Sequence, residues 1–356
     1  MEPRVVIKTH AGVSHPGLFS ILIEKCCYPD KSSPERIVSK RLYNFLEEIR
    51  EFRLGAKFAV IMAKRFGFLQ SNMTWSWRSH VMHAVLVHLG KTESSKPAPY
   101  FDLSAMEKII YLKYYLEADG AMLLLLAKEL NSAGKISEIE IGERIHFLFR
   151  QIYSDYIDLS PDFRSRTILR ERLKKIQKGR YDPQEVRHKI FPHLEPLVHL
   201  GLLQKLEAGR DTQFYPLSLE GSDTLATRVI EDELSDFQRM EVRFSMGEYF
   251  DVIANLLFPA TYKKYTDMDG KSVTSVIYEG YNRIKDSVTG TASIEALSDW
   301  TCTTLLAEQQ ILIPRSRVET LLENAWRCNP DGVRFHVDFQ GHRSYVILTE
   351  EFVRPR

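Results

Sequence analysis

A helix that stops at a glycine and leads directly into a β-hairpin is the pattern that most constrains the fold of this chain. Apolar residues recur at spacings of three and four through 186–200, which places them on one face of a helix. Asp182 and Pro183 suit its N-cap and first position, and Gly201 is a typical stop signal. Two short alternating runs then flank a polar loop that contains a glycine. The stretch 182–220 therefore predicts a helix, a glycine stop and a two-stranded ribbon.

Proline inside the expected helix leaves its continuity open. Pro196 removes one backbone hydrogen bond from a helix interior and kinks the axis. The alternative is two short helices that break near Pro192 or Pro196, which would change the side chains that face outwards.

The same succession returns near the C-terminus. A helix is expected over 276–288, and Ser293 suits the N-cap of a second helix over 296–308. A third helix begins near Arg315. Two alternating runs around a turn that contains a glycine then form the clearest hairpin of the chain. These runs are 333–339 and 344–348.

Capped helices fill much of the remaining sequence. Ser104 and Glu107 have the spacing of a capping box, in which each side chain bonds the backbone N–H of the other residue. Near the N-terminus, Ser33 is the expected cap of a helix that opens with Pro34, and Gly67 is a stop before an aromatic run. Further helices are expected over 55–66, 79–89, 105–116, 121–130, 139–157 and 167–178.

Helices that end in a glycine stop and feed a two-stranded ribbon resemble the recognition helix and wing of winged-helix proteins. The resemblance covers 104–220 and 272–353 and rests on these outlines. It implies a mainly α fold with small β-hairpins, arranged as tandem winged-helix-like units. The implied domains are an N-terminal helical, winged-helix-like domain at 1–100, a winged-helix domain with a basic helix at 101–221, an acidic helical connector at 222–271 and a C-terminal winged-helix domain at 272–356.

Charge is unevenly distributed in a chain whose net charge is only +1. From Arg164 to Lys189 there are ten lysines and arginines against three acids, whereas Glu220 to Asp251 contains nine acids and three arginines. The basic block lies before and inside the expected recognition helix, where it would attract phosphates and make binding depend on salt. A solvated helix face with no partner is the alternative interpretation of the same charges.

A helix in the major groove can read base edges, because each base pair presents its own donors and acceptors there. The polar outer positions of the expected recognition helix include Arg187, which suits guanine, and Gln184, which suits adenine. Arg210 lies at the hairpin tip, where it can reach a phosphate or the minor groove. The candidate nucleic-acid contacts are Arg170, Lys174, Lys175, Lys178, Arg180, Gln184, Arg187, His188, Lys189, Arg210, Arg315, Arg317 and Arg343.

Other chemistry finds little support in the sequence. P-loop, dinucleotide-binding, HExxH and GxSxG motifs are absent, the histidines do not stand at ligand spacing, and the four cysteines form no CxxC pair. No apolar run is long enough to cross a bilayer, and the first residues lack the apolar core of a signal peptide. We therefore expect a cytoplasmic protein that is not an enzyme and uses no cofactor, metal or membrane. A nuclease subunit that uses Asp338 is the catalytic alternative.

The expected function is non-catalytic binding of double-stranded DNA by a subunit of a larger assembly of prokaryotic type. Such assemblies serve regulation, replication and partition, or antiviral defence. Protein partner subunits or self-association are expected as well. The alternative is an adaptor that uses winged-helix folds to dock a protein partner.

Overall fold

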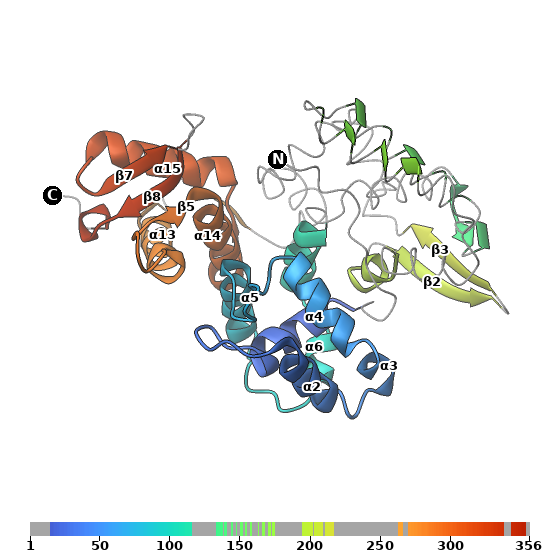
Figure 1. The fold of residues 1–356 in the computed structure, drawn as a ribbon. Coiled ribbons are helices and arrows are strands. Elements are labelled where there is room, and N and C mark those ends of the chain that lie inside the picture. The colour runs from blue at the N-terminus through green and yellow to red at the C-terminus, as the bar shows by residue number, and fades with distance from the viewer. Residues whose placement is uncertain are drawn as a thin grey trace.

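The computed structural model describes residues 15–115, 133–137, 194–201, 203–208, 211–216, 263–265, 270–337 and 343–353, with scattered helical positions between 139 and 174. Helices make up most of these residues, and small sheets of two or three strands accompany them (Figure 1). The expectation of a mainly α fold with small β-hairpins is therefore confirmed. The predicted helix at 121–130 lies outside the described residues.

Short helices surround an aromatic core in the N-terminal part of the chain. Phe19 stacks on Phe68 with ring centroids 5.2 Å apart and contacts Phe66 at the same distance. Tyr111 and Tyr115 close this cluster from the helical residues 105–115. The elements are α1 (Gly17–Ile21), the π-helix η1 (Leu22–Cys26), α2 (Glu35–Phe45), α3 (Arg50–Arg53), α4 (Ala56–Arg65), α5 (Trp77–His88) and α6 (Ala98–Phe101).

The start of α2 differs from the sequence prediction. Ser33 does not cap this helix: Pro34 holds the N-cap position, and the Ser33 hydroxyl accepts a hydrogen bond from Arg41 Nη1 at 3.4 Å. The prediction placed the start of the helix at Pro34, one residue too early, because the helix begins at Glu35. The helices expected over 55–66 and 79–89 are confirmed as α4 and α5, and Gly67 takes the left-handed conformation after α4 with φ of 73°.

A three-stranded sheet contains the hairpin expected after Gly201. β2 (Leu203–Ala208) and β3 (Asp211–Pro216) pair antiparallel, and β1 (Ile136–Ser137) joins β3, which gives the order β1–β3–β2. Gly201 has a φ of 76°, so the predicted stop is confirmed. The helical residues 194–199 continue through Pro196, whose carbonyl accepts from the Leu200 N–H at 2.9 Å. Residues 181–193, with Pro192, lie outside the described residues.

The C-terminal part repeats this sheet order. Here β5 pairs with β8, and β8 pairs with β7, all antiparallel. The predicted cap is confirmed, because Ser293 Oγ accepts from the Ala296 N–H at 3.3 Å. The first helix begins at Gly270, earlier than expected, and ends at Ile284. The elements are α13 (Gly270–Ile284), β5 (Ala292–Ser293), α14 (Ile294–Gln309), β6 (Ile311–Leu312), α15 (Arg315–Cys328), β7 (Val333–Val337), β8 (Arg343–Leu348) and the 3₁₀ turn η5 (Glu350–Phe352); β6 pairs in parallel with β4 (Lys263–Lys264).

A two-residue strand that ends in a capping serine is common to both sheets. Ser137 closes β1, and its Oγ accepts from the Glu140 N–H at 3.1 Å while Glu140 Oε2 accepts from the Ser137 N–H at 2.8 Å. These bonds lower the pKa of Glu140. Ser293 closes β5 and caps α14 in the same way. The sequence prediction missed the Ser137 box, although its Ser-x-x-Glu spacing could have revealed it.

Helix α14 joins the N-terminal and C-terminal parts of the chain. It packs against α13 and α15 of its own part and against α5 of the N-terminal part (Figure 1). Ile294 and every residue from Ala296 to Ala307 are therefore buried. Lys113 Nζ donates to Asp299 Oδ2 at 2.7 Å across this junction, and both side chains are at most 3% exposed.

The contact between α13 and α14 leaves no room for a side chain at Gly280. A methyl group there would lie 2.3 Å from Trp300 Cδ1. We expect Gly280→Ala to lower the free energy of unfolding by about 1–3 kcal/mol, as overpacked cores do. Without this clash, alanine would stabilise the helix by about 1 kcal/mol, so a variant more stable than the wild type in urea unfolding contradicts the prediction. The exposed Asn282→Ala is the control, with an expected change within about 0.5 kcal/mol.

Candidate nucleic-acid interface

The predicted contacts of the basic block fall into a described and an undescribed group. Arg170 and Lys174 are helical and exposed, four residues apart and hence on one side of a helix. Arg144 and Arg150, on earlier helical positions, are exposed as well. The remaining candidates of this part lie outside the described residues: Lys175, Lys178, Arg180, Gln184, Arg187, His188, Lys189 and Arg210.

The three C-terminal candidates have different surroundings. Arg315 has a side chain only 12% exposed, and its Nε donates to Glu319 Oε1 at 2.9 Å. Nearby carboxylates, Asp299 first among them, raise the pKa of Arg315 against the opposing effect of burial. Arg317 is half-buried, with its guanidinium 5.7 Å from the ring centre of Tyr265. Because Arg315 points into a carboxylate environment, we leave it out of the proposed binding surface.

Arg343 lies between the ribbon and α15. Its guanidinium stands 4.5 Å from the ring centre of Trp326 and 5.0 Å from that of Phe335. Its Nη1 is 3.4 Å from Glu323 Oε1, while Arg327 Nη2 is 3.7 Å from Glu323 Oε2. Two arginines therefore share one carboxylate beside the start of β8, which leaves one net positive charge there.

An uncharged polar stripe with one cation at its end runs along the outer side of α15. Ser316, Thr320, Asn324 and Arg327 recur at helical spacing, and all four are exposed. The buried Val318 and Leu322 hold the opposite side of the helix against the core. Asparagine can pair with adenine and arginine with guanine in the major groove. Thr320 and Asn324 are not among the contacts predicted from the sequence, although their spacing from Ser316 places them on the same side of the helix.

Charge differs between the two ends of the described structure. Residues 15–115 contain fifteen lysines and arginines against nine acids, whereas residues 270–337 and 343–353 contain eight against ten. A phosphate backbone is attracted by the first and weakly repelled by the second. The middle and C-terminal parts therefore share a sheet order, but the C-terminal part does not have a net positive charge.

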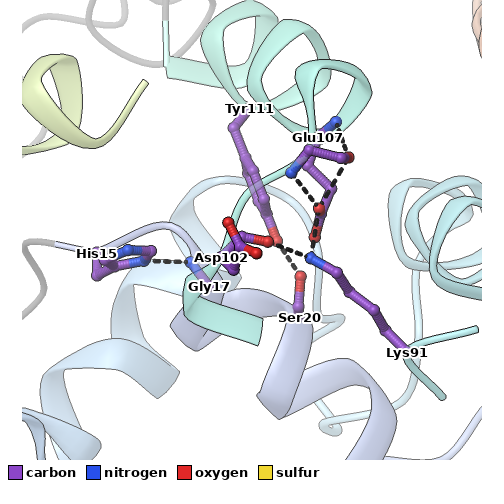
Figure 2. A network of polar contacts seen from close by, with 8 residues as sticks. His15, Gly17, Ser20, Lys91, Asp102, Glu107 and Tyr111 are labelled. Atoms are coloured by element: carbon purple, nitrogen blue, oxygen red, sulfur yellow. Dashed lines mark hydrogen bonds and ion pairs between the residues drawn. The ribbon is translucent and has the colours of Figure 1, made fainter. Parts of the chain in front are cut away.

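A network of buried polar groups fixes the helical residues 105–115 to the N-terminal core (Figure 2). The predicted capping box is confirmed: Glu107 Oε2 accepts from the Ser104 N–H at 2.8 Å, and Ser104 Oγ accepts from the Glu107 N–H at 3.2 Å. Lys91 Nζ donates to the same carboxylate at 2.7 Å. One turn further on, Tyr111 is hydrogen-bonded to Ser20. Because Glu107, Tyr111 and Ser20 are fully buried, this network suits a structural role and leaves no access for a substrate.

Several histidine and cysteine side chains are buried or paired within the described structure, whereas His88, His336 and Cys328 are exposed. His83 Nδ1 lies 2.7 Å from the largely buried Glu24 Oε1, beside the ring of Trp75. Cys26 and Cys27 are buried, and burial raises the pKa of Cys27 to about 12. Among the described residues, no group of three or more His, Cys, Asp or Glu is placed to hold a metal ion. Asp338 lies outside them.

Comparison with protein-family models, curated proteins and solved structures found no match for this chain. Among the described helices, none combines the length and the apolar character that a bilayer crossing requires.

Proposed function

We propose that this protein binds duplex DNA without catalysis, through two winged-helix units that lie within 101–221 and 272–356. The observation that carries the proposal is the repeated order of elements. In each unit a helix precedes a two-residue strand, and a serine at the end of that strand caps the next helix. A further helix then leads into a two-stranded ribbon. In the middle unit this is the helical segment that ends at a glycine, and in the C-terminal unit it is α15. In each sheet the third strand lies between the first and the second.

This order suits a groove-binding module for a physical reason. In the C-terminal unit the short first strand and the ribbon pack against α14 and α15, and one side of α15 stays exposed. On α15 that face carries Ser316, Thr320, Asn324 and Arg327, which offer donors and acceptors to base edges, together with Glu323, whose carboxylate lies 3.7 Å from Arg327 Nη2. Arg317 and Arg343 flank this face, and Arg343 lies near the start of the ribbon's second strand.

Most of the affinity in this proposal comes from the middle unit. The sequence from Arg164 to Lys189 has a net charge of +7, and the described Arg170 and Lys174 are exposed. Each lysine or arginine that meets a phosphate releases a counterion, so the logarithm of the binding constant falls linearly with the logarithm of salt concentration. A subunit of a larger assembly would combine this surface with protein contacts elsewhere.

Reversing two charges of the middle unit tests the proposal. We expect the wild type to bind a labelled duplex in fluorescence anisotropy with a steep salt dependence. The salt slope is the slope of the logarithm of the binding constant against the logarithm of salt concentration. In the double variant Arg170→Glu/Lys174→Glu its magnitude should fall by about 2, because each lost phosphate contact lowers it by about 1. Lys285→Glu, an exposed reversal in the C-terminal unit, is the control and should leave the slope unchanged. Absence of wild-type binding at low salt sinks the proposal.

A protein-docking role is the second candidate, and the C-terminal unit favours it. That unit has more acids than bases, and Val337 and Tyr345 on its ribbon are 60% and 47% exposed. Apolar and aromatic surface of this kind is enriched at protein interfaces. If docking is the function, a partner co-purifies with the wild type, Val337→Asp/Tyr345→Asp releases it, and DNA binding is absent or insensitive to the charge reversals.

A further inference from the structure

The N-terminal part of the chain has a reduced form of the same element order. After α1 and η1, Tyr28 forms an isolated bridge with Thr74, and Leu69 forms another with Trp75. The segment 74–75 therefore lies between 28 and 69, as the third strand does in the two sheets. The bridge at Tyr28 is parallel, whereas the corresponding strand pairs in the sheets are antiparallel. In this order α2 corresponds to the second helix of the C-terminal unit, and α4 corresponds to the third, which precedes the ribbon.

Basic side chains gather where α2 begins and α4 ends. Arg36 and Lys40 are exposed one turn apart on α2, and Lys64 and Arg65 close α4. Lys64 Nζ lies 3.4 Å from Glu35 Oε2, which brings the two helix ends together. We call this set the α2–α4 basic surface; its members are Lys31, Arg36, Lys40, Lys64 and Arg65.

Acidic side chains only partly offset this surface. Glu35 belongs to it and is already held by Lys64, and the exposed Asp30 precedes Lys31. Two other acids of the N-terminal part face inwards, because Glu24 binds His83 and Glu107 binds Lys91 within the structure, whereas Glu93 and Asp102 are exposed. The exposed Glu47 and Glu48 follow the opposite end of α2.

Helix stability accounts for Lys64 and Arg65 but does not explain the position of Arg36. Lys64 and Arg65 stand in the last turn of α4, where a cation complements the helix dipole. Arg36 stands in the first turn of α2, where the positive end of the dipole disfavours a cation. A positive charge that slightly weakens its own helix is consistent with selection for an anionic partner.

We propose that the α2–α4 basic surface is a further contact with the phosphate backbone of duplex DNA. This inference rests on the proposed function and extends it to a part of the chain for which the sequence analysis named no DNA contact. In this arrangement the N-terminal and middle parts supply charge, while α15 supplies polar groups for base edges. The α5–α14 junction and the Lys113–Asp299 ion pair hold the basic surface and α15 in one body.

The full-length double variant Arg36→Glu/Lys40→Glu tests the inference. We expect the salt slope for duplex binding to fall by about 2 and the affinity near physiological salt to weaken by about tenfold. Lys57→Glu/Lys96→Glu is the matched control, since it makes the same charge change at exposed positions of the same part of the chain outside the surface. That control should change the affinity less than about twofold.

The outcomes separate the two proposals. Wild-type binding with an unchanged slope in Arg36→Glu/Lys40→Glu overturns this inference and leaves the proposed function standing. A slope that falls equally in the control also overturns it, because net charge alone would then explain the effect. No binding by the wild type overturns the proposed function itself. Thermal unfolding checks the fold, and an acid at position 36 is expected to keep or raise the midpoint because it suits the helix start.

Discussion

Replacing Lys113 by methionine is expected to lower the free energy of unfolding by about 3–5 kcal/mol. The change leaves the carboxylate of Asp299 buried without the ammonium that lies 2.7 Å away. Its second oxygen, Oδ1, already has no hydrogen-bond partner among the described residues. Arg315 remains near Asp299 and limits the loss, yet water cannot reach the site to replace the lost bond. Urea unfolding followed by circular dichroism measures the effect.

Two further variants sharpen this test. The double variant Lys113→Met/Asp299→Leu should recover part of the loss, because replacing both partners of a buried pair with apolar groups leaves no unpaired charge between them. Arg283→Met breaks an ion pair of similar length, 2.8 Å to Glu279, whose side chains are about half exposed. It should cost less than about 0.5 kcal/mol. A loss below about 1 kcal/mol in Lys113→Met contradicts the burial of this pair.

Lowering the pH from 6.5 is expected to destabilise the protein through His15. Burial, followed by the neighbouring His199 ring 4.0 Å away, lowers the pKa of His15 from 6.5 to about 3. His15 Nδ1 accepts a hydrogen bond from the Gly17 N–H at 3.0 Å, which the neutral ring allows (Figure 2). Between these pKa values the unfolded chain binds a proton that the folded chain does not. The free energy of unfolding therefore falls by about 1.4 kcal/mol for each unit of pH lost.

The substitution His15→Asn isolates this contribution. Asparagine keeps an acceptor for the Gly17 N–H but does not titrate. We expect the variant to lose less stability than the wild type between pH 6.5 and pH 4.5, measured as urea midpoints at several pH values. Carboxyl groups titrate in both proteins, so the difference between the profiles belongs to His15. His88→Asn, at the exposed end of α5, is the control and should show the same change of stability with pH as the wild type. If His15→Asn and the wild type lose the same stability over this pH range, His15 is not the cause.

Local signals predicted much of the secondary structure. Gly67 and Gly201 end helices in the left-handed conformation, as a residue without Cβ allows at low cost. Ser104 with Glu107, and Ser293, cap the helices that follow them because their side chains reach the first free N–H groups. The Ser33 prediction is wrong because the hydroxyl binds Arg41, a residue more than one helical turn further on.

The candidate interface was less accessible from sequence. The residue type of Arg315 suggests a DNA contact, yet the carboxylates of Asp299 and Glu319 hold it in a mostly buried position. The stripe that ends at Arg327 contains only one charged residue, so a search for cations passes over Thr320 and Asn324. The charges of a segment can be counted from the sequence, but the sequence does not show which acids are already paired within the fold.

The sequence by itself determined where helices begin and end and where the ribbons turn, because caps, glycine stops and alternation act over a few neighbouring residues. Tertiary structure alone decided that α14 is buried on all sides and that Lys113 meets Asp299, 186 positions away. Its residues Ser298, Asp299 and Thr303 look like a solvent-facing side of an amphipathic helix until α5 covers it. The physical reason is that burial depends on which distant surface packs against a helix, and no local pattern encodes that partner.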